Sequence, residues 1–238
     1  SSPRPPPGST YFPDPQPFRD EFPGRSKGRR AVTAFGMTLI LIGLALLGYM
    51  AWEYYGTNIV SKHKQSEIKQ QLFNDWGKGL DSDAIGLLRV QRFGNKYEAP
   101  IVKGFTPDAL ARGVGWDTKS AKPGQIGNFV IAGHRVTHGE LFSKFPSLQR
   151  GDLVVVETRK DIYTYKLRNS GTSITVDFTA SWPLQPVPDP RAKGQRQTHA
   201  VLTMLTCSEL FHTRHRSVVI GDLVATEVKT NKTGATSG

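Results

Sequence analysis

The chain has 238 residues, of which 37% are hydrophobic, and its 31 lysines and arginines outnumber its 20 acidic residues to give a formal net charge of +11. A single cysteine excludes an internal disulfide, and without a His-Glu-x-x-His run it also argues against a zinc site. The positive charge is spread along the chain with no nucleic-acid-binding motif, so it suits an anionic lipid or wall surface better than nucleic acid.

The first 30 residues cannot form a hydrophobic core. Eight of the first 24 are proline, with Gly, Ser and charged residues between them. This composition is typical of disordered segments. We expect residues 1–30 to be a Pro-rich disordered tail.

Residues 31–52 carry no charge. As a helix rising ~1.5 Å per residue they would extend roughly 33 Å, enough to cross the hydrocarbon core of a bilayer. A buried core helix would show a polar face, which this segment lacks. A cleaved signal peptide would have a shorter apolar region of about 7–15 residues and a small-residue cleavage site. The segment is therefore predicted to be a retained transmembrane signal-anchor helix.

The charges that flank this segment predict its orientation. Arg25, Lys27, Arg29 and Arg30 directly precede it, whereas Glu53 follows it. Positive residues concentrate on the cytoplasmic side of single membrane spans. We therefore expect a single-pass protein of the cell membrane, with a cytoplasmic N-terminus and with residues 53–238 outside.

Residues 53–82 are polar and rich in lysine and glutamine. Ile68, Leu72, Phe73 and Trp76 recur near helical spacing. Two interpretations remain open for this segment: an amphipathic helix that serves as a stalk, or a solvated linker.

The folded domain is expected at residues 83–229, followed by a flexible tail at 230–238. It contains eight short segments rich in Val, Ile, Thr and Tyr, separated by Gly, Pro, Asn or Asp. Many short strands at close spacing predict a mainly β fold, a barrel or a sandwich. Pro100, near the start of its segment, predicts an edge strand. The eight expected strands are 84–92, 99–102, 127–134, 152–159, 162–168, 173–176, 200–208 and 217–229.

Short helical turns are expected at 106–112, where Thr-Pro-Asp is typical of a helix start, and at 140–148. Residues 179–199 form a long loop with Trp182 and several prolines. Loops of this length in a compact domain are usually functional or disordered. The loop is expected to form one wall of a binding groove or to be a plain surface excursion.

Cys207 ends the expected strand 200–208. Strand alternation places it on the same face as Val201, Thr203 and Leu205. A free cysteine is most often a small buried hydrophobic residue. The polar residues that follow Cys207 favour exposure at a rim instead, where a nearby cation would stabilise the nucleophilic thiolate.

Two histidines compete for the role of general acid and base. His134 ends an expected strand directly after Gly133, which would allow the close approach of another group. His138 lies four residues later in a turn and is expected to be held less rigidly. We favour His134, and we expect His212 and His215 to be solvated.

Two arginines compete in the same way. Arg216 directly precedes an apolar run, on a strand expected to form a hairpin with the Cys207 strand and to lie at the same end as the cysteine. Arg214 has the same strand parity, so alternation does not separate the two. We favour Arg216 because it adjoins the apolar run.

Together these residues resemble the sortases, membrane-anchored cysteine transpeptidases of Gram-positive bacteria. The family hallmark is a Thr-Leu-x-Thr-Cys strand, then an Arg before a short apolar strand, with a His in a separate upstream strand. The corresponding runs here are Thr203-Met-Leu-Thr-Cys207, Arg216-Ser-Val-Val-Ile-Gly and Asn128-Phe-Val-Ile-Ala-Gly-His134-Arg-Val-Thr-His-Gly. The Gly-His-Arg-x-Thr-His-Gly run is most similar to actinobacterial class E members. The resemblance covers residues 83–227.

The resemblance implies an eight-stranded sortase-type β-barrel with short helices, preceded by one transmembrane helix. It implies that Cys207 attacks the Thr–Gly bond of a C-terminal sorting signal, that His134 transfers protons and that Arg216 stabilises the oxyanion. Class E implies a Leu-Ala-x-Thr-Gly signal rather than Leu-Pro-x-Thr-Gly.

The resemblance also implies partners. These are secreted proteins that bear the signal, a lipid II-type cell-wall precursor that supplies the accepting amine, and the membrane. No cofactor, metal or nucleic acid is expected, and the chain is expected to be a monomer.

Two residues depart from the family pattern. Met204 stands where Leu is usual, a volume-conserving change. Leu205 stands where class E usually has Thr, on the Cys207 face, and is expected to alter the groove. Together with Thr206 and Trp182, Leu205 is expected to contact the substrate.

Two rival functions remain. An L,D-transpeptidase would need a Ser-His-Gly-Cys type of run, whereas this chain has Leu-Thr before its cysteine. A non-catalytic, membrane-tethered β-domain that binds wall polymer or protein would have Cys207 merely buried. Thiol labelling of the native protein would separate that second rival from an enzyme.

Overall fold

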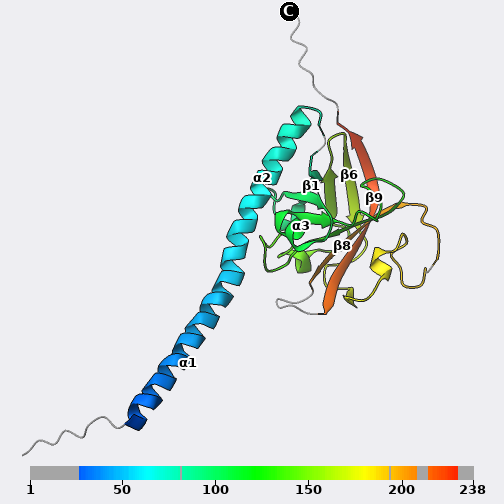
Figure 1. Cartoon of the computed structure of the whole chain (residues 1–238). Coiled ribbons are helices and arrows are strands. Elements are labelled where there is room, and N and C mark those ends of the chain that lie inside the picture. Colours follow the sequence, from blue (N-terminus) through cyan, green and yellow to red (C-terminus); the bar gives the residue numbers. More distant parts are fainter. Residues whose placement is uncertain (1–26, 81, 193, 208–213, 230–238) are drawn as a thin grey trace, which may run out of the picture. The chain divides into compact units, whose positions relative to one another are not determined.

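A computed structural model of the chain describes residues 27–80, 82–192, 194–207 and 214–229 (Figure 1). For Lys27 and Cys207 it describes the backbone only. The chain divides after Leu47 into two units, residues 1–47 and 48–238. Of the expected tail at 1–30, residues 1–26 lie outside the described residues, whereas residues 27–30 form the first turn of a helix. The expected tail at 230–238, Ser208 at the end of an expected strand, and His212 also lie outside the described residues.

The N-terminal helix α1 (Lys27–Ala51) begins with basic residues and is apolar on all sides from Ala31 on. Its large side chains are exposed around the whole helix, among them Phe35 at 67%, Leu41 at 63% and Leu47 at 65%. Within the described part of the chain, the continuous helical stretch that begins with α1 is the one stretch long and apolar enough to cross a membrane. The sequence prediction of one N-terminal apolar helix is confirmed.

The second unit includes the helix α2 (Thr57–Gly77), which follows a short π-helical segment η1 (Trp52–Gly56). Ile68 and Leu72 of α2 are buried against Leu87, Val102 and Ala109 of the β-domain. Residues 57–77 are therefore a helix, as one of the two interpretations anticipated, and this helix packs on the domain and is not a solvated linker.

The β-domain is a closed barrel of eight strands, with a short ninth strand, β7, added to the start of β9 (Figure 1). The order β6-β5-β1-β2-β3-β4-β8-β9 is closed by pairing of β9 with β6. The eight-stranded barrel implied by the resemblance is thus confirmed. The strands are β1 (Ala84–Val90), β2 (Ala99–Lys103), β3 (Val114–Trp116), β4 (Gly127–Ala132), β5 (Leu153–Glu157), β6 (Asp161–Leu167), β7 (Thr175–Asp177), β8 (Ala200–Cys207) and β9 (His215–Val228).

The barrel interior holds one large hydrophobic cluster, with Phe129, Tyr165, Leu202 and Met204 among its fully buried members. Leu202 and Met204 alternate with residues on the other face of β8, as the period of a strand requires. Met204, one of the two departures from the family pattern, therefore fills the core. Its volume matches the usual Leu closely enough to keep that packing.

The outer face of β4 and β8 is covered by the long loop at 179–199. Asn128 of β4 donates its Nδ2 to the carbonyl oxygens of Pro183 and Gln185, both at 2.8 Å. Its Oδ1 accepts from the Thr203 hydroxyl at 2.7 Å. Buried polar groups are stable only when they are hydrogen-bonded, so this amide holds the loop onto the barrel.

The strands β2 and β3 differ from the sequence prediction in two respects. β3 was not expected, because a three-residue strand with a central glycine, Val114-Gly-Trp116, has too short a pattern to recognise. The expectation that Pro100 marks an edge strand is wrong, since β2 pairs with both β1 and β3. Proline is tolerated there because the register with β3 begins only at Ile101.

The short helices follow the expectations in part. α3 (Pro107–Arg112) begins as expected, with the Thr106 hydroxyl accepting from the Ala109 N–H at 3.2 Å. The expected helical turn at 140–148 is reduced to a 3-10 turn, η3 (Phe145–Ser147). Two further 3-10 turns are η2 (Gln91–Phe93) and η4 (Trp182–Leu184).

Candidate active site

The cysteine strand and the arginine strand meet in register. β8 and β9 pair antiparallel, and this pairing places Cys207 opposite Arg216. Cys207 is the last residue of β8, and Arg216 is the second residue of β9. The expected hairpin partners therefore lie at one end of the barrel. The structure places the backbone of Cys207, and its side chain lies outside what is described.

His134 reaches the same end through a parallel pairing. β4 and β8 run in step up to Ala132 opposite Leu205. The same register, if continued for two residues past its end, would bring His134 level with Cys207. Two hydrogen bonds continue the pairing past the end of β4: the Gly133 N–H donates to the Leu205 carbonyl at 3.2 Å, and the Thr206 hydroxyl donates to the Gly133 carbonyl at 2.9 Å.

His134 itself stands two residues beyond its strand, which corrects the expectation that the strand ends with this histidine. Its carbonyl accepts from the Phe142 N–H at 2.9 Å. The close approach expected at Gly133 is made by the Phe142 ring, since a Cβ on that glycine would lie 2.9 Å from the ring. His134 is thus held by packing as well as by the strand that precedes it.

His138 lies beside His134, and the two rings stack with centroids 4.6 Å apart and an interplanar angle of 26°. His138 adopts a left-handed backbone conformation with φ 55°, and its Nδ1 lies 3.0 Å from the Thr137 hydroxyl. Of the two histidines, His134 lines the pocket described below. The geometry therefore favours His134.

The structure also separates the two arginines. Arg216 is half-buried and lines the pocket, and its Nη1 donates to the His215 carbonyl at 3.0 Å. Arg214 is exposed, with Nε 3.7 Å from an Asp177 carboxylate oxygen and its guanidinium 5.2 Å from the Phe178 ring centroid. Hydrogen bonds from Thr179, and to a lesser degree the charge of Arg214, hold the pKa of Asp177 below its usual range.

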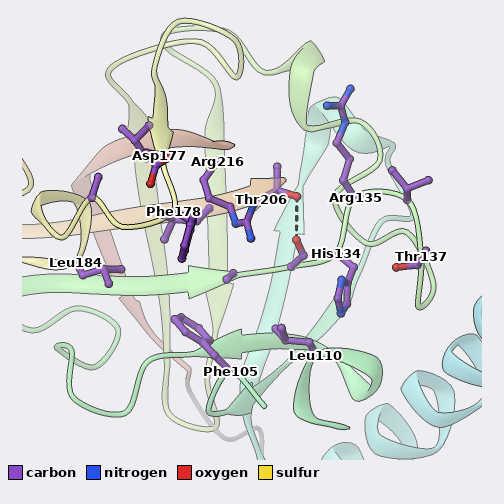
Figure 2. A pocket seen from close by; sticks show the side chains of 16 residues that line it. Phe105, Leu110, His134, Arg135, Thr137, Asp177, Phe178, Leu184, Thr206 and Arg216 are labelled. Carbon is purple, nitrogen blue, oxygen red and sulfur yellow. Dashed lines mark hydrogen bonds between the residues drawn. The ribbon is translucent and has the colours of Figure 1, made fainter. Parts of the chain in front are cut away.

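A pocket of about 360 Å³ lies at this end of the barrel (Figure 2). Phe105 and Leu110 lie on one side of it, and Phe178 and Arg216 lie on the opposite side. The lining is mostly apolar, with a few convergent polar groups, which is the usual composition of a ligand site. The residues that line it are Phe105, Leu110, Ala132, Gly133, His134, Arg135, Val136, Thr137, Val176, Asp177, Phe178, Ala180, Leu184, Leu205, Thr206 and Arg216.

Two of the three residues expected to contact the substrate line the pocket, and the third does not. Leu205 and Thr206 line the pocket. Trp182 is absent from the described lining, although Ala180 and Leu184 on either side of it are present. The start of the 179–199 loop therefore contributes to the pocket wall, as one of its two interpretations anticipated, through residues other than its tryptophan.

The apolar walls of the pocket were not predicted from the sequence. Phe105 lies between β2 and α3, whereas Phe178 and Leu184 lie in the connection between β7 and β8; the three side chains are 37%, 55% and 41% exposed. Their one signal in the sequence is a large apolar residue beside a turn or a proline. Among the described residues, no group of three or more His, Cys, Asp and Glu side chains is arranged to hold a metal ion.

Comparison of the chain with known protein families identifies the family to which it belongs. The model of the sortase domain matches residues 88–224. The chain belongs to the sortase family. The matched segment contains His134, Cys207 and Arg216, and it begins after α2. Membership decides between the enzyme and the rival functions: the protein is a cysteine transpeptidase.

The relatives place the chain in class E. Sortase SrtE2 of Streptomyces coelicolor is 29% identical over 225 residues, 86% of each chain. Sortase SrtE1 of the same organism is 30% identical over 208 residues, 82% of this chain and 57% of that protein.

Solved structures of class E sortases resemble the structure of this chain. Sortase E from Streptomyces avermitilis superposes with a TM-score of 0.54 at 29% identity, covering 61% of this chain and 91% of that one. Sortase E1 from S. coelicolor, solved with a tripeptide in its active site, gives a TM-score of 0.54 at 27% identity with the same coverage.

Proposed function

We propose that the protein cleaves a C-terminal sorting signal between Thr and Gly and joins the new carboxyl end to an amine of a cell-wall precursor. Cys207, His134 and Arg216 are assigned to the chemistry. The observation that supports the assignment is the register of β8 and β9, which pairs Cys207 with Arg216, together with the apolar pocket that both Arg216 and His134 line.

In the first half-reaction, the thiolate of Cys207 attacks the Thr carbonyl carbon of the signal. A C–S bond forms and the carbonyl becomes an oxyanion, which the guanidinium of Arg216 stabilises. Collapse of this intermediate breaks the C–N bond to Gly. His134 gives its proton to the departing amine, which leaves a thioester on Cys207 and a neutral imidazole.

In the second half-reaction, an incoming amine attacks the thioester carbonyl. His134 takes the proton of that amine, the new C–N bond forms and the thiolate of Cys207 departs. One amide bond is broken and one is made, so the cycle needs no oxidant, metal or cofactor. The accepting amine is proposed to be that of a lipid II-type wall precursor.

The preferred signal is proposed to be Leu-Ala-x-Thr-Gly. Support comes from the class E relatives and from the apolar walls of the pocket, in which Leu205 replaces the Thr usual for the class. The tripeptide in the active site of S. coelicolor sortase E1 shows that a class member takes a short peptide there. Thr206 and Leu205 are proposed to contact the bound signal.

The enzyme is proposed to act as a monomer at the outer face of the cell membrane, with α1 as its anchor. The apolar length of α1 supports the span. The lysine and arginine residues before that apolar run support a cytoplasmic N-terminus. Residues 1–30 would then be a cytoplasmic tail, and the barrel would face secreted substrates and wall precursors.

The test uses the full chain in detergent with two peptides that differ only in Leu-Ala-x-Thr-Gly against Leu-Pro-x-Thr-Gly, each with a glycine nucleophile, read by mass spectrometry. We expect a thioacyl adduct on Cys207, cleavage between Thr and Gly, and a faster reaction of the Ala peptide. The Cys207→Ala variant is the control. Cleavage at another bond, or no adduct with either peptide, would refute the proposal.

A further inference from the structure

The turn that follows His134 has an unusual backbone. Three consecutive residues, His138, Gly139 and Glu140, have positive φ values of 55°, 89° and 54°. Residues with a side chain rarely adopt this region, because Cβ meets the backbone there. Such a conformation persists only where surrounding contacts impose it.

Asn58 of α2 supplies one set of these contacts. Its Oδ1 accepts a hydrogen bond from the Gly139 N–H at 2.8 Å, and its Nδ2 donates to the Glu140 carboxylate at 2.8 Å. The same Nδ2 lies 3.5 Å from the Val136 carbonyl oxygen. The side chain is buried, so these bonds are shielded from water. One amide thus binds three positions of the turn.

Gln65, two helical turns further along α2, supplies the second set. Its Nε2 donates to the His138 carbonyl at 3.1 Å and lies 3.5 Å from the Ala111 carbonyl oxygen. A Cβ on Gly139 would fall 2.4 Å from that Nε2. The glycine therefore serves both its own φ and the close approach of Gln65.

The turn that these amides hold is in direct contact with His134. The His138 ring stacks on the His134 ring at 4.6 Å. In the sequence, the turn connects His134 to Phe142. The Phe142 N–H donates a hydrogen bond to the His134 carbonyl, so both ends of the turn are joined. A change in the backbone at 138–140 would therefore move the surface against which the His134 imidazole rests.

Simple anchoring of α2 does not require amides at these two positions. Ile68 and Leu72 pack the same helix on the barrel through apolar burial alone. Burying an amide is favourable only when its polar atoms find partners. Here most of those partners lie in the turn after His134. The two side chains are therefore placed to set the shape of that turn.

We propose that Asn58 and Gln65 are positioning residues, which hold the 136–140 turn in its left-handed shape and thereby aim His134 at the scissile bond. This inference rests on the proposed role of His134. It assigns the aim of the imidazole to α2, a helix outside the residues matched by the sortase-domain model. Loss of either amide should slow proton transfer more than it weakens peptide binding, because Val136 and Thr137 are the residues of the turn that line the pocket and the other walls lie on separate segments.

The experiment compares Asn58→Ala and Gln65→Ala with Asn74→Ala and Gln71→Ala in the full chain. The control residues are the same types on exposed positions of the same helix. We expect kcat for the sorting peptide to fall about ten-fold in each test variant, with KM changed less than about two-fold, because misplacing a catalytic group by about 1 Å costs up to ~10²-fold. The controls should match the parent chain.

A third variant, Gln65→Glu, keeps the side-chain size but removes the N–H donor to His138. It should lose kcat like Gln65→Ala, and it decides the question if an alanine variant fails to fold. In each folded variant, the ¹⁵N resonances of the His134 imidazole should shift relative to the parent chain, which a helix that only stabilises the fold would not produce.

The inference fails if the folded test variants keep the kcat and the His134 resonances of their controls. His134→Ala, measured alongside, separates this failure from a failure of the proposed function. If His134→Ala is inactive while the α2 variants are normal, the catalytic assignment stands and the positioning role is wrong. If His134→Ala retains activity, the catalytic assignment itself is wrong.

Discussion

Cys207 and Arg216 lie opposite each other in the antiparallel pairing of β8 and β9. Residues in such a pair are neighbours on one face of a sheet. The backbone therefore brings the cysteine and the guanidinium-bearing residue together before any ligand arrives. A site organised in advance loses little free energy to rearrangement when charge develops in the transition state.

Replacing Cys207 by alanine should abolish both the thioacyl adduct and transfer, because no other residue of the chain carries a thiol. Removal of one sulfur atom at a strand end should cost far less stability than truncation of a large core side chain. Mass spectrometry of the enzyme with a sorting peptide, together with thermal unfolding, checks both parts. An unfolded variant would instead support a buried, structural cysteine.

Arg216→Lys should lower kcat/KM by about 10²–10³-fold although the charge is kept, because a lysine ammonium lacks the rigid fork of donors that a guanidinium presents. Arg214→Lys is the matched control. Arg214 is exposed and is itself absent from the described pocket lining, and a lysine there would keep a positive charge beside Asp177, so its replacement should be mild. Steady-state kinetics on the sorting peptide decide the matter, and greater sensitivity at Arg214 would reverse the assignment.

His134→Ala should reduce kcat by about 10²–10⁴-fold, the usual contribution of a general acid and base. His138→Ala should cost no more than about ten-fold, because it removes a stacking neighbour and not the proton carrier. Rates with a single peptide at saturating concentration provide the comparison. Equal losses at the two positions would show that the choice between them is wrong.

The sequence predicted most of the barrel because its strands carry a local signal. Apolar β-branched residues and turn residues mark β4, β8 and β9 without knowledge of their partners. The strand β3 is too short to carry such a signal, and Pro100 was assigned to an edge because strand pairing is not local. The pocket walls were missed because they too depend on contacts between distant segments, since Phe105 and Phe178 come to line one pocket only in the folded barrel.

The helix α2 was difficult to predict from the sequence for a different reason. Its buried face includes Asn58, Ser61 and Gln65 alongside Ile68 and Leu72. Polar residues on a buried face weaken the apolar period that marks an amphipathic helix. The sequence therefore left the helix and the solvated linker both open, and the contacts that explain the polar residues of the segment appear only in the fold.

The closure of the barrel should make stability depend on pH through Glu157. Burial disfavours ionisation of this carboxylate, but hydrogen bonds from Lys229 at 2.6 Å and from Arg89 outweigh that effect and lower its pKa from 4.5. Between pH 4.5 and the lower folded-state pKa, the unfolded chain binds more protons than the folded one. The free energy of unfolding should therefore rise with pH across that interval.

Urea unfolding at a series of pH values tests this prediction in the full chain and in Glu157→Gln. The parent chain should have the full contribution of Glu157 above pH 4.5 and lose it as the pH falls through the folded-state pKa. The variant should be less stable above pH 4.5 and should show a shallower loss on acidification, because its amide does not titrate. Glu227→Gln, at an exposed position of β9, is the matched control and should leave the slope unchanged. Equal slopes in the parent chain and Glu157→Gln would show that this carboxylate does not couple barrel closure to pH.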